Sequence, residues 1–261
     1  MSELVNFNGS LAVFFTFLII LLRVSAIIVV APVFSSSAIP PQVKIAFAFV
    51  FSLALYPVVK GYIQLPDFTV LNIAMITVRE LLLAVAMAIC IHFVWAGIEL
   101  GAQLVGFMMG FSIANVLSPE ENVQISILSE FASIFAILVF LIIDGHYVFI
   151  RAMADSFRLI PVGGFVAGKS LFNAFNHLVV MMFGIAFKVL SPAIIALLIT
   201  NVVFGIIARV MPQINVMIVA FPLSIGIGLF VLGITFAYSA GVISSYYQQA
   251  LSIVYAILGG K

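Results

Sequence analysis

The stretch SPAIIALLITNVVFGIIARVMPQINVMIVAFPLSIGIGL, Ser191 to Leu229, decides the fold. It places one short polar turn, ARVMPQIN, between two apolar runs that cover 171–209 and 214–258. The first run alone would reach about 58 Å as a continuous helix, whereas the hydrocarbon core of a bilayer is about 30 Å thick. One proline interrupts each run, and membrane helices tolerate such prolines as kinks. We therefore expect one long, bent helical hairpin with its tip near Arg209–Asn215.

The composition of the whole chain agrees with a membrane location. Of its 261 residues 65% are hydrophobic and only 7% are charged, and the mean hydropathy is +1.37. Soluble domains carry roughly 45–50% apolar and about 25% charged residues, so a water-soluble fold could not cover this core. The sequence predicts an all-α, polytopic membrane protein or a subunit inside a membrane complex. Further apolar windows cover 11–34, 45–59, 68–98, 102–117 and 123–143.

Charge is unevenly distributed along the chain. Residues 1–155 hold five Lys or Arg and all nine Asp or Glu, for a net charge of −4. Residues 156–261 hold five Lys or Arg and no acid, for a net charge of +5. Such an asymmetry indicates different surroundings or partners for the two parts.

Four charged residues lie inside the apolar stretches of residues 1–110: Arg23, Arg79, Glu80 and Glu99. Each charge at a bilayer centre costs about 2.5–3.5 kcal/mol on insertion scales. Arg79 and Glu80 cannot simply neutralise each other, because sequence neighbours point about 100° apart on a helix. Each therefore needs a partner elsewhere, and we expect these helices to face other protein far more than lipid.

The segment GFMMGFSIANVLSPEEN, Gly106 to Asn122, combines flexible backbone with soft apolar side chains and acid. Glycine permits dihedral angles that other residues avoid, and methionine adapts to surfaces that change. Phe and Met on a segment hinged by glycine could form a deformable apolar stopper that gates by excluding water. A kinked packing helix explains the same residues, and the sequence alone leaves both interpretations open.

A nucleotide-binding motif is imitated but rejected. Gly163 to Ser170, GGFVAGKS, matches G-x-x-x-x-G-K-[ST] letter for letter. That motif needs a parallel sheet, for which a chain of membrane-length apolar runs has no room. We interpret it as a flexible, slightly basic loop before the next helix.

Other polar groups give no sign of catalysis. Arg151, Asp155 and Arg158 share one helical face at i,i+4 and i,i+3 spacing. Asp144 and His146 could form a proton relay, but an interfacial turn explains them as well. His and Cys spacings match no metal site, so we expect no enzyme activity, no cofactor, no metal and no nucleic-acid binding.

Four stretches resemble the FliR family of flagellar export-gate proteins and its virulence counterpart, the SctT family. They are RVSAIIVVAPVFSSSAIPPQVKIAFAF, ELGAQLVGFMMGFSIANVLSPE, IDGHYVFIRAMADSF and the hairpin stretch quoted first. The resemblance covers nearly the whole chain in order. The matching residues are Arg23, Pro32, Pro40, Lys44, the glycines after Glu99, Asp144-Gly145-His146, Arg209, Pro212, Gln213 and Asn215.

This resemblance implies a subunit of the type III export gate in the bacterial inner membrane and flagellar basal body. It implies assembly with FliP and FliQ, next to FlhB and FlhA, around a channel for unfolded flagellar subunits. Residues 1–165 would be FliP-like hairpins with a central plug loop, and residues 166–261 a FliQ-like hairpin. The complex would project to the periplasmic side, with the Arg209–Asn215 turn on the cytoplasmic side near FlhB.

The resemblance also implies roles for individual residues. The plug loop maps onto the Gly106–Asn122 segment, with Gly106, Phe107, Met108, Met109, Gly110 and Phe111 as the seal and Glu120 and Glu121 at its wet end. The residues expected in partner contact or assembly are Arg23, Lys44, Arg79, Glu80, Glu99, Asp144, His146, Arg209, Pro212 and Gln213.

Two further functions stay open beside the flagellar gate, and a third, disfavoured above, can be tested at one residue. The chain could serve a virulence secretion system. It could be a secondary solute transporter that uses Arg79, Glu80 and Glu99 as midplane charges. A nucleotide-dependent membrane enzyme would depend on Lys169.

Overall fold

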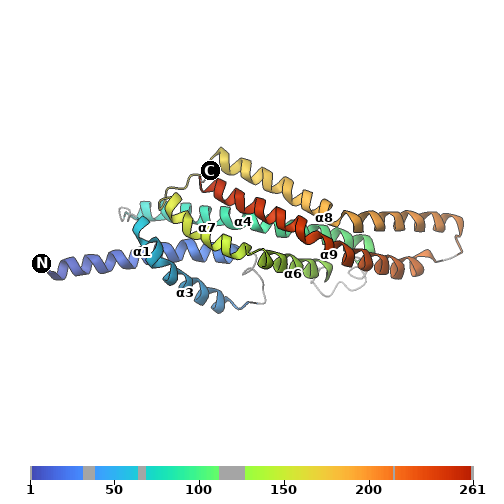
Figure 1. Ribbon diagram of the computed structural model, residues 1–261, viewed down its shortest axis with the longest axis horizontal. Helices are drawn as coiled ribbons and strands as arrows, with labels where there is room; N and C mark the ends of the chain where they lie inside the picture. The colour runs from blue at the N-terminus through green and yellow to red at the C-terminus, as the bar shows by residue number, and fades with distance from the viewer. Residues whose placement is uncertain (1, 32–38, 64–68, 112–126, 214, 260–261) are drawn as a thin grey trace. The chain divides into compact units, whose positions relative to one another are not determined.

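The computed structural model describes residues 2–31, 39–63, 69–111, 127–213 and 215–259, and these ranges contain helices and turns but no strand. The all-α prediction is confirmed. In chain order the helices are α1 (Ser2–Val30), α3 (Pro41–Val59), the short 3-10 helix η1 (Lys60–Tyr62), α4 (Val70–Met109), α6 (Ile127–Ile142), α7 (Gly145–Leu159), α8 (Lys169–Val210) and α9 (Val216–Ile257) (Figure 1).

The predicted C-terminal hairpin is present. Helices α8 and α9 have 42 residues each, and the short connection between them has a turn at Pro212 and Gln213. Pro192 lies inside α8 and Pro222 inside α9, and neither ends its helix. Gly184 of α8 lies beside Tyr246 of α9, since a Cβ at this glycine would stand 3.9 Å from the tyrosine hydroxyl. The apolar runs therefore set the length of the hairpin correctly.

Helix α4 joins two of the apolar windows. One helix of 40 residues, Val70–Met109, continues from the window 68–98 into the window 102–117. Within it, Trp95 donates a hydrogen bond to the carboxylate of Glu99, one turn later. Gly101 is a packing residue, since an added Cβ would approach the Ala186 carbonyl oxygen of α8 to 2.7 Å.

Two local signals fix where helices begin. Pro41 stands in the first turn of α3, where its missing N–H leaves no helical hydrogen bond unmade. Asp144, between α6 and α7, has a left-handed backbone with φ of 56°. Aspartate tolerates this conformation better than most residues, so Asp144 can redirect the chain.

The chain forms two compact units. The first contains residues 1–92, 144–177 and 249–261, and the second contains 93–143 and 178–248. Helix α4 contributes residues to both. The predicted boundary between residues 165 and 166 was based on resemblance to two other subunits. The compact units do not test such a resemblance, so the boundary stays a prediction.

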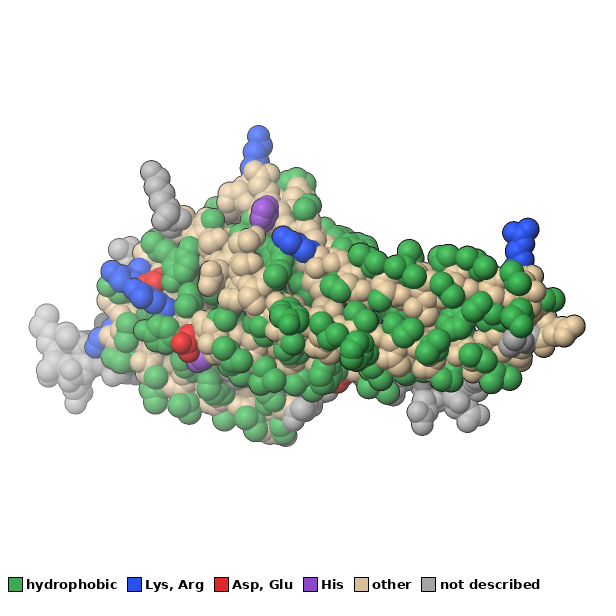
Figure 2. All heavy atoms as spheres, turned by 45° about the vertical axis from the view of Figure 1, so that its right-hand side comes forward, with side chains coloured by type: hydrophobic (Ala, Val, Ile, Leu, Met, Phe, Trp, Pro, Cys, Tyr) green, Lys and Arg blue, Asp and Glu red, His purple; other side chains and the backbone are tan. Residues whose placement is uncertain are grey.

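Among the described residues, five helices are long and apolar enough to cross a membrane, or six spans are present if α6 and α7 form one broken span. They differ in how much of their surface the chain itself covers. In the apolar windows, 61% of α4 is buried within the chain, but only 11% of α8 and 22% of α9. Figure 2 shows hydrophobic side chains over most of the face in view, with few charged ones. The hairpin therefore needs lipid or other protein around it.

Candidate functional site

The predicted plug segment begins as the last turn of α4. Residues Gly106 to Met109 are helical, and Gly110 follows with φ of 90°, a conformation that glycine adopts without strain. A Cβ at Gly110 would also lie 2.6 Å from the ring of Phe221 on α9. Gly110 therefore allows a turn and a close packing contact at the end of α4, and the hinge expected there stays a prediction. Residues 112–126, which include Glu120 and Glu121, lie outside the described residues.

The apolar side chains of this segment have unequal surroundings. Phe107 is 68% exposed, whereas Met109 is fully buried. Met109 packs on Gly228 of α9, where an added Cβ would collide with its side chain. Met108 and Phe111 are partly exposed. Within the described part of the segment, Phe107 is free to contact something else, and Met109 acts as a packing residue.

The most densely bonded polar cluster lies in the first unit and joins two of the four interior charges. The guanidinium of Arg23 on α1 donates two hydrogen bonds to the carboxylate of Glu80 on α4, from Nε to Oε2 and from Nη2 to Oε1 at 2.9 Å. Their side chains are 0% and 1% exposed. Two parallel bonds between these groups form the strongest geometry available to an ion pair.

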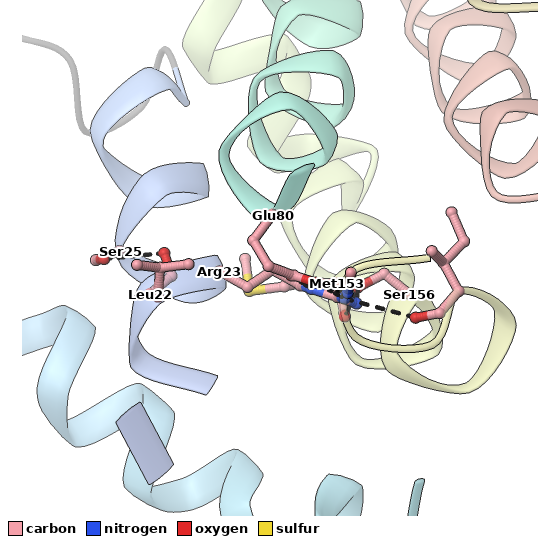
Figure 3. A network of polar contacts seen from close by, with 8 residues as sticks. Leu22, Arg23, Ser25, Glu80, Met153 and Ser156 are labelled. Carbon is pink, nitrogen blue, oxygen red and sulfur yellow. Dashed lines mark hydrogen bonds and ion pairs between the residues drawn. The ribbon is translucent and has the colours of Figure 1, made fainter. Parts of the chain in front are cut away.

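A hydroxyl, a backbone carbonyl and an aromatic ring also contact the guanidinium of Arg23. Its Nη1 donates to Ser156 Oγ on α7 at 3.1 Å, and its Nη2 reaches the carbonyl of Ile160 at 3.5 Å. The ring of Phe157 lies 4.2 Å from the guanidinium carbon. Figure 3 shows Arg23 extending from α1 past Glu80 toward Ser156. The ion pair therefore connects α1, α4 and α7.

Arg79 and Glu80 hold the same glycine. The N–H of Gly163 donates to Glu80 Oε1 at 2.8 Å, and Arg79 Nη1 donates to the carbonyl oxygen of Gly163 at 2.8 Å. Gly163 has φ of 68°, and a Cβ there would meet Ile76 at 2.8 Å. The two sequence neighbours, which cannot pair with each other, thus fix the turn that precedes α8.

These contacts correct one expectation drawn from the interior charges. Arg23 and Glu80 neutralise each other inside the chain, so no neighbouring subunit is needed for that. Removing one partner of a buried ion pair costs about 3–5 kcal/mol, because the other charge is left unpaired. Arg79 binds the carbonyl oxygen of Gly163, which gives it a hydrogen-bond acceptor but no counter-charge. The predicted role of these three residues in partner contact stays a prediction.

The turn at Gly163 also explains the imitated nucleotide motif. The described residues before it form α7 and a turn rather than a strand, and Lys169 is the first residue of α8. The first glycine of the motif is committed to Glu80 and Arg79. The rejection of a phosphate-binding loop therefore agrees with the local structure.

The remaining predicted residues are spread over the two units. Asp144 and His146 are exposed at the start of α7, and Arg209, Pro212 and Gln213 are exposed at the hairpin tip. Lys44 of α3 is partly exposed and interacts with another group of the protein. The face shared by Arg151, Asp155 and Arg158 is present, with both ion pairs at 4.0 Å. No group of three or more metal-ligating side chains occurs among the described residues.

Sequence reasoning missed four residues that complete these sites. Ser156 and Gly163 bind the buried ion pair, Trp95 donates to Glu99, and Ser133 accepts a hydrogen bond from Trp95. Only Trp95 carried a local signal, because it precedes Glu99 by one helical turn. The other three are distant in sequence from the residues that they contact.

The fold and the site define the class of this protein as an all-α, polytopic membrane protein whose interior charged residues form hydrogen bonds or an ion pair within the chain. The family described as bacterial export proteins, family 1, matches residues 14–250. This chain belongs to that family. The match covers far more than half of the chain, so the predicted resemblance is confirmed.

Individual relatives of this chain indicate the same family. The chain is 30% identical over 215 residues to the flagellar biosynthetic protein FliR of Pectobacterium carotovorum, covering 81% of this chain and 80% of the relative. It is 27% identical over 209 residues to FliR of Escherichia coli, covering 80% and 79%. It is 26% identical over 234 residues to FliR of Bacillus subtilis, covering 86% and 87%. The family and these relatives support a subunit of the flagellar type III export gate in the inner membrane.

Proposed function

We propose that the chain assembles with FliP-type and FliQ-type subunits and helps to form and seal the channel through which unfolded flagellar subunits leave the cell. Residues 1–165 would correspond to FliP and residues 166–261 to FliQ. FlhB-type and FlhA-type proteins would lie nearby, with the hairpin tip at Arg209, Pro212 and Gln213 facing FlhB on the cytoplasmic side. The complex would project to the periplasmic side.

The length and exposure of the hairpin carry this proposal. Helices of 42 residues reach about 63 Å, twice the roughly 30 Å hydrocarbon core of a bilayer. Exposed apolar residues nevertheless continue along α8 from Phe172 to Val210. Lipid can cover only part of that surface, and tilt changes this little. Neighbouring subunits are the natural cover for the rest.

A flagellar gate is favoured over a virulence secretion subunit and over a solute transporter. The three relatives described above are flagellar proteins, which disfavours a virulence system. A solute transporter would need its midplane charges to face a solute path, but Glu80 is 1% exposed and bonded on both oxygens.

Assembly is tested by purification of a tagged chain in gentle detergent. FliP-type and FliQ-type proteins should be recovered with it in fixed proportion, and deletion of the gene should abolish flagella. Two results together would contradict the proposal. The tagged chain would be recovered alone as a stable monomer, and cells would still build normal flagella after deletion of the gene.

The seal is tested by comparing two single variants. Phe107→Ala removes an exposed side chain and should let small ions leak through membranes that hold the assembled gate. Met109→Ala opens a cavity in the second unit and should lower stability by about 2–5 kcal/mol. The variant with Phe107, Met108, Met109 and Phe111 all changed to alanine should leak most. A tight barrier in Phe107→Ala and in the fourfold variant, with normal assembly, would remove the plug assignment.

A further inference from the structure

Glu99 is held in place by neighbouring residues of the second unit. Trp95 Nε1 donates to Glu99 Oε1 at 2.9 Å and also donates to Ser133 Oγ on α6. Ser129 of α6 donates to the backbone carbonyl of Glu99 at 3.4 Å. On neighbouring positions of α4, Gly97 and Gly101 pack closely on α8. The carboxylate is therefore oriented by a tryptophan on its own helix.

This carboxylate has no cation beside it in the described part of the chain. Among the described residues, the ion pairs within 4.0 Å join Arg23 to Glu80 and Asp155 to its two arginines. Internal segments outside the described ranges, 32–38, 64–68, 112–126 and 214, contain no Lys or Arg. The described residues thus give Glu99 a hydrogen-bond donor but no counter-charge.

The second oxygen of Glu99 is open. Its Oε2 receives no hydrogen bond from the described residues, where every fully enclosed polar side-chain atom has one. This oxygen is therefore accessible. The surroundings on its own helix are apolar, because α4 is long and apolar enough to cross a membrane. A charge in such surroundings is costly once lipid or protein covers them, unless the cover brings a cation.

We propose that Glu99 accepts an ion pair from another subunit, in which a Lys or Arg side chain binds Oε2 while Trp95 holds Oε1. This inference rests on the proposed assembly and specifies one contact within it. The partner is a protein surface that presents one basic side chain in an apolar setting. A carboxylate with one oxygen already fixed loses little freedom when the cation arrives, which favours such a contact.

The test compares Glu99→Gln with Glu130→Gln. Glutamine keeps the length and the acceptor for Trp95 but removes the charge, so recovery of partner subunits with the tagged chain should fall about tenfold or more. Glu130 is exposed in the first turn of α6, and its variant should assemble normally. Trp95 is the only tryptophan of the chain. Its fluorescence therefore reports whether the local structure of each variant is intact.

Each outcome decides one question. Normal recovery of partner subunits with Glu99→Gln would overturn the ion pair, because glutamine imitates a protonated, uncharged glutamate. The gate proposal would stay intact. Failure of the unaltered chain to recover partners would instead remove the gate proposal. If Glu99→Gln shifts the tryptophan emission, Glu99→Asp is compared, because it keeps the charge but shortens the reach to Trp95. Equal losses in both variants would assign Glu99 to the local fold and overturn the ion pair.

Discussion

The two glutamates of α4 sit in the same apolar helix, but only Glu80 has a counter-charge among the described residues. Glu80, in the first unit, is enclosed and bonded to Arg23 and Gly163. Glu99, in the second unit, has one hydrogen bond from Trp95 and no cation within 4.0 Å among the described residues. Glu80 is enclosed and Glu99 is partly exposed, so the two differ both in burial and in which residues the fold brings near. An interior charge therefore does not by itself indicate a subunit contact.

The largest effect is expected from breaking the enclosed pair. Glu80→Leu leaves Arg23 charged and buried, so the free energy of unfolding in detergent should fall by about 3–5 kcal/mol. The double variant Arg23→Leu with Glu80→Leu should recover most of that loss, because two apolar side chains replace the pair. Denaturant titration followed by circular dichroism measures both. Equal losses in the single and double variants would show that the unpaired charge is not the cause of the loss.

The next effect sharpens the role of the turn held by Glu80. Gly163→Ala forces a left-handed backbone on alanine and brings its Cβ to 2.8 Å from Ile76, so it should cost about 1–3 kcal/mol. Gly168→Ala is the matched control, because no atom lies within 4 Å of the added Cβ. Thermal unfolding of both variants gives the comparison. A control that is as unstable as Gly163→Ala would mean that the loop tolerates no side chain for other reasons.

A smaller loss is expected at Arg79. Arg79→Gln removes the hydrogen bond to the Gly163 carbonyl at a partly exposed site, so stability should fall by about 1–2 kcal/mol. The same unfolding measurement applies, with Arg151→Gln as a control because that side chain is 70% exposed and its ion pair should contribute little. A loss of stability as large as that of Glu80→Leu would mean that Arg79 contributes as much as Glu80 to holding the turn at Gly163.

The smallest effect is expected from Glu99→Leu in the isolated chain. No cation among the described residues is left unpaired by this change, so the stability of the chain should move by no more than about 1 kcal/mol in either direction. Unfolding followed by Trp95 fluorescence measures this directly. A loss of several kcal/mol would reveal a partner for Glu99 inside the chain and would erase the contrast with Glu80.

Sequence patterns located most helices because an apolar run records its own length. The hairpin tip between α8 and α9 could be predicted from one polar turn between two runs. The two windows on either side of Glu99 belong to one helix, α4, which the list of apolar windows did not state. The contacts of Glu99 with Trp95 and of Gly101 with α8 could be seen only in the structure.

The sequence by itself determined the membrane class, the helical hairpin, the family resemblance and the presence of charges that need partners. These depend on composition, on local order and on residues close in the chain. The tertiary structure alone decided that Arg23 meets Glu80, that Arg79 and Glu80 share Gly163, and that Glu99 keeps an open oxygen. Such pairings join distant segments, and they follow from which helices pack together rather than from any local pattern.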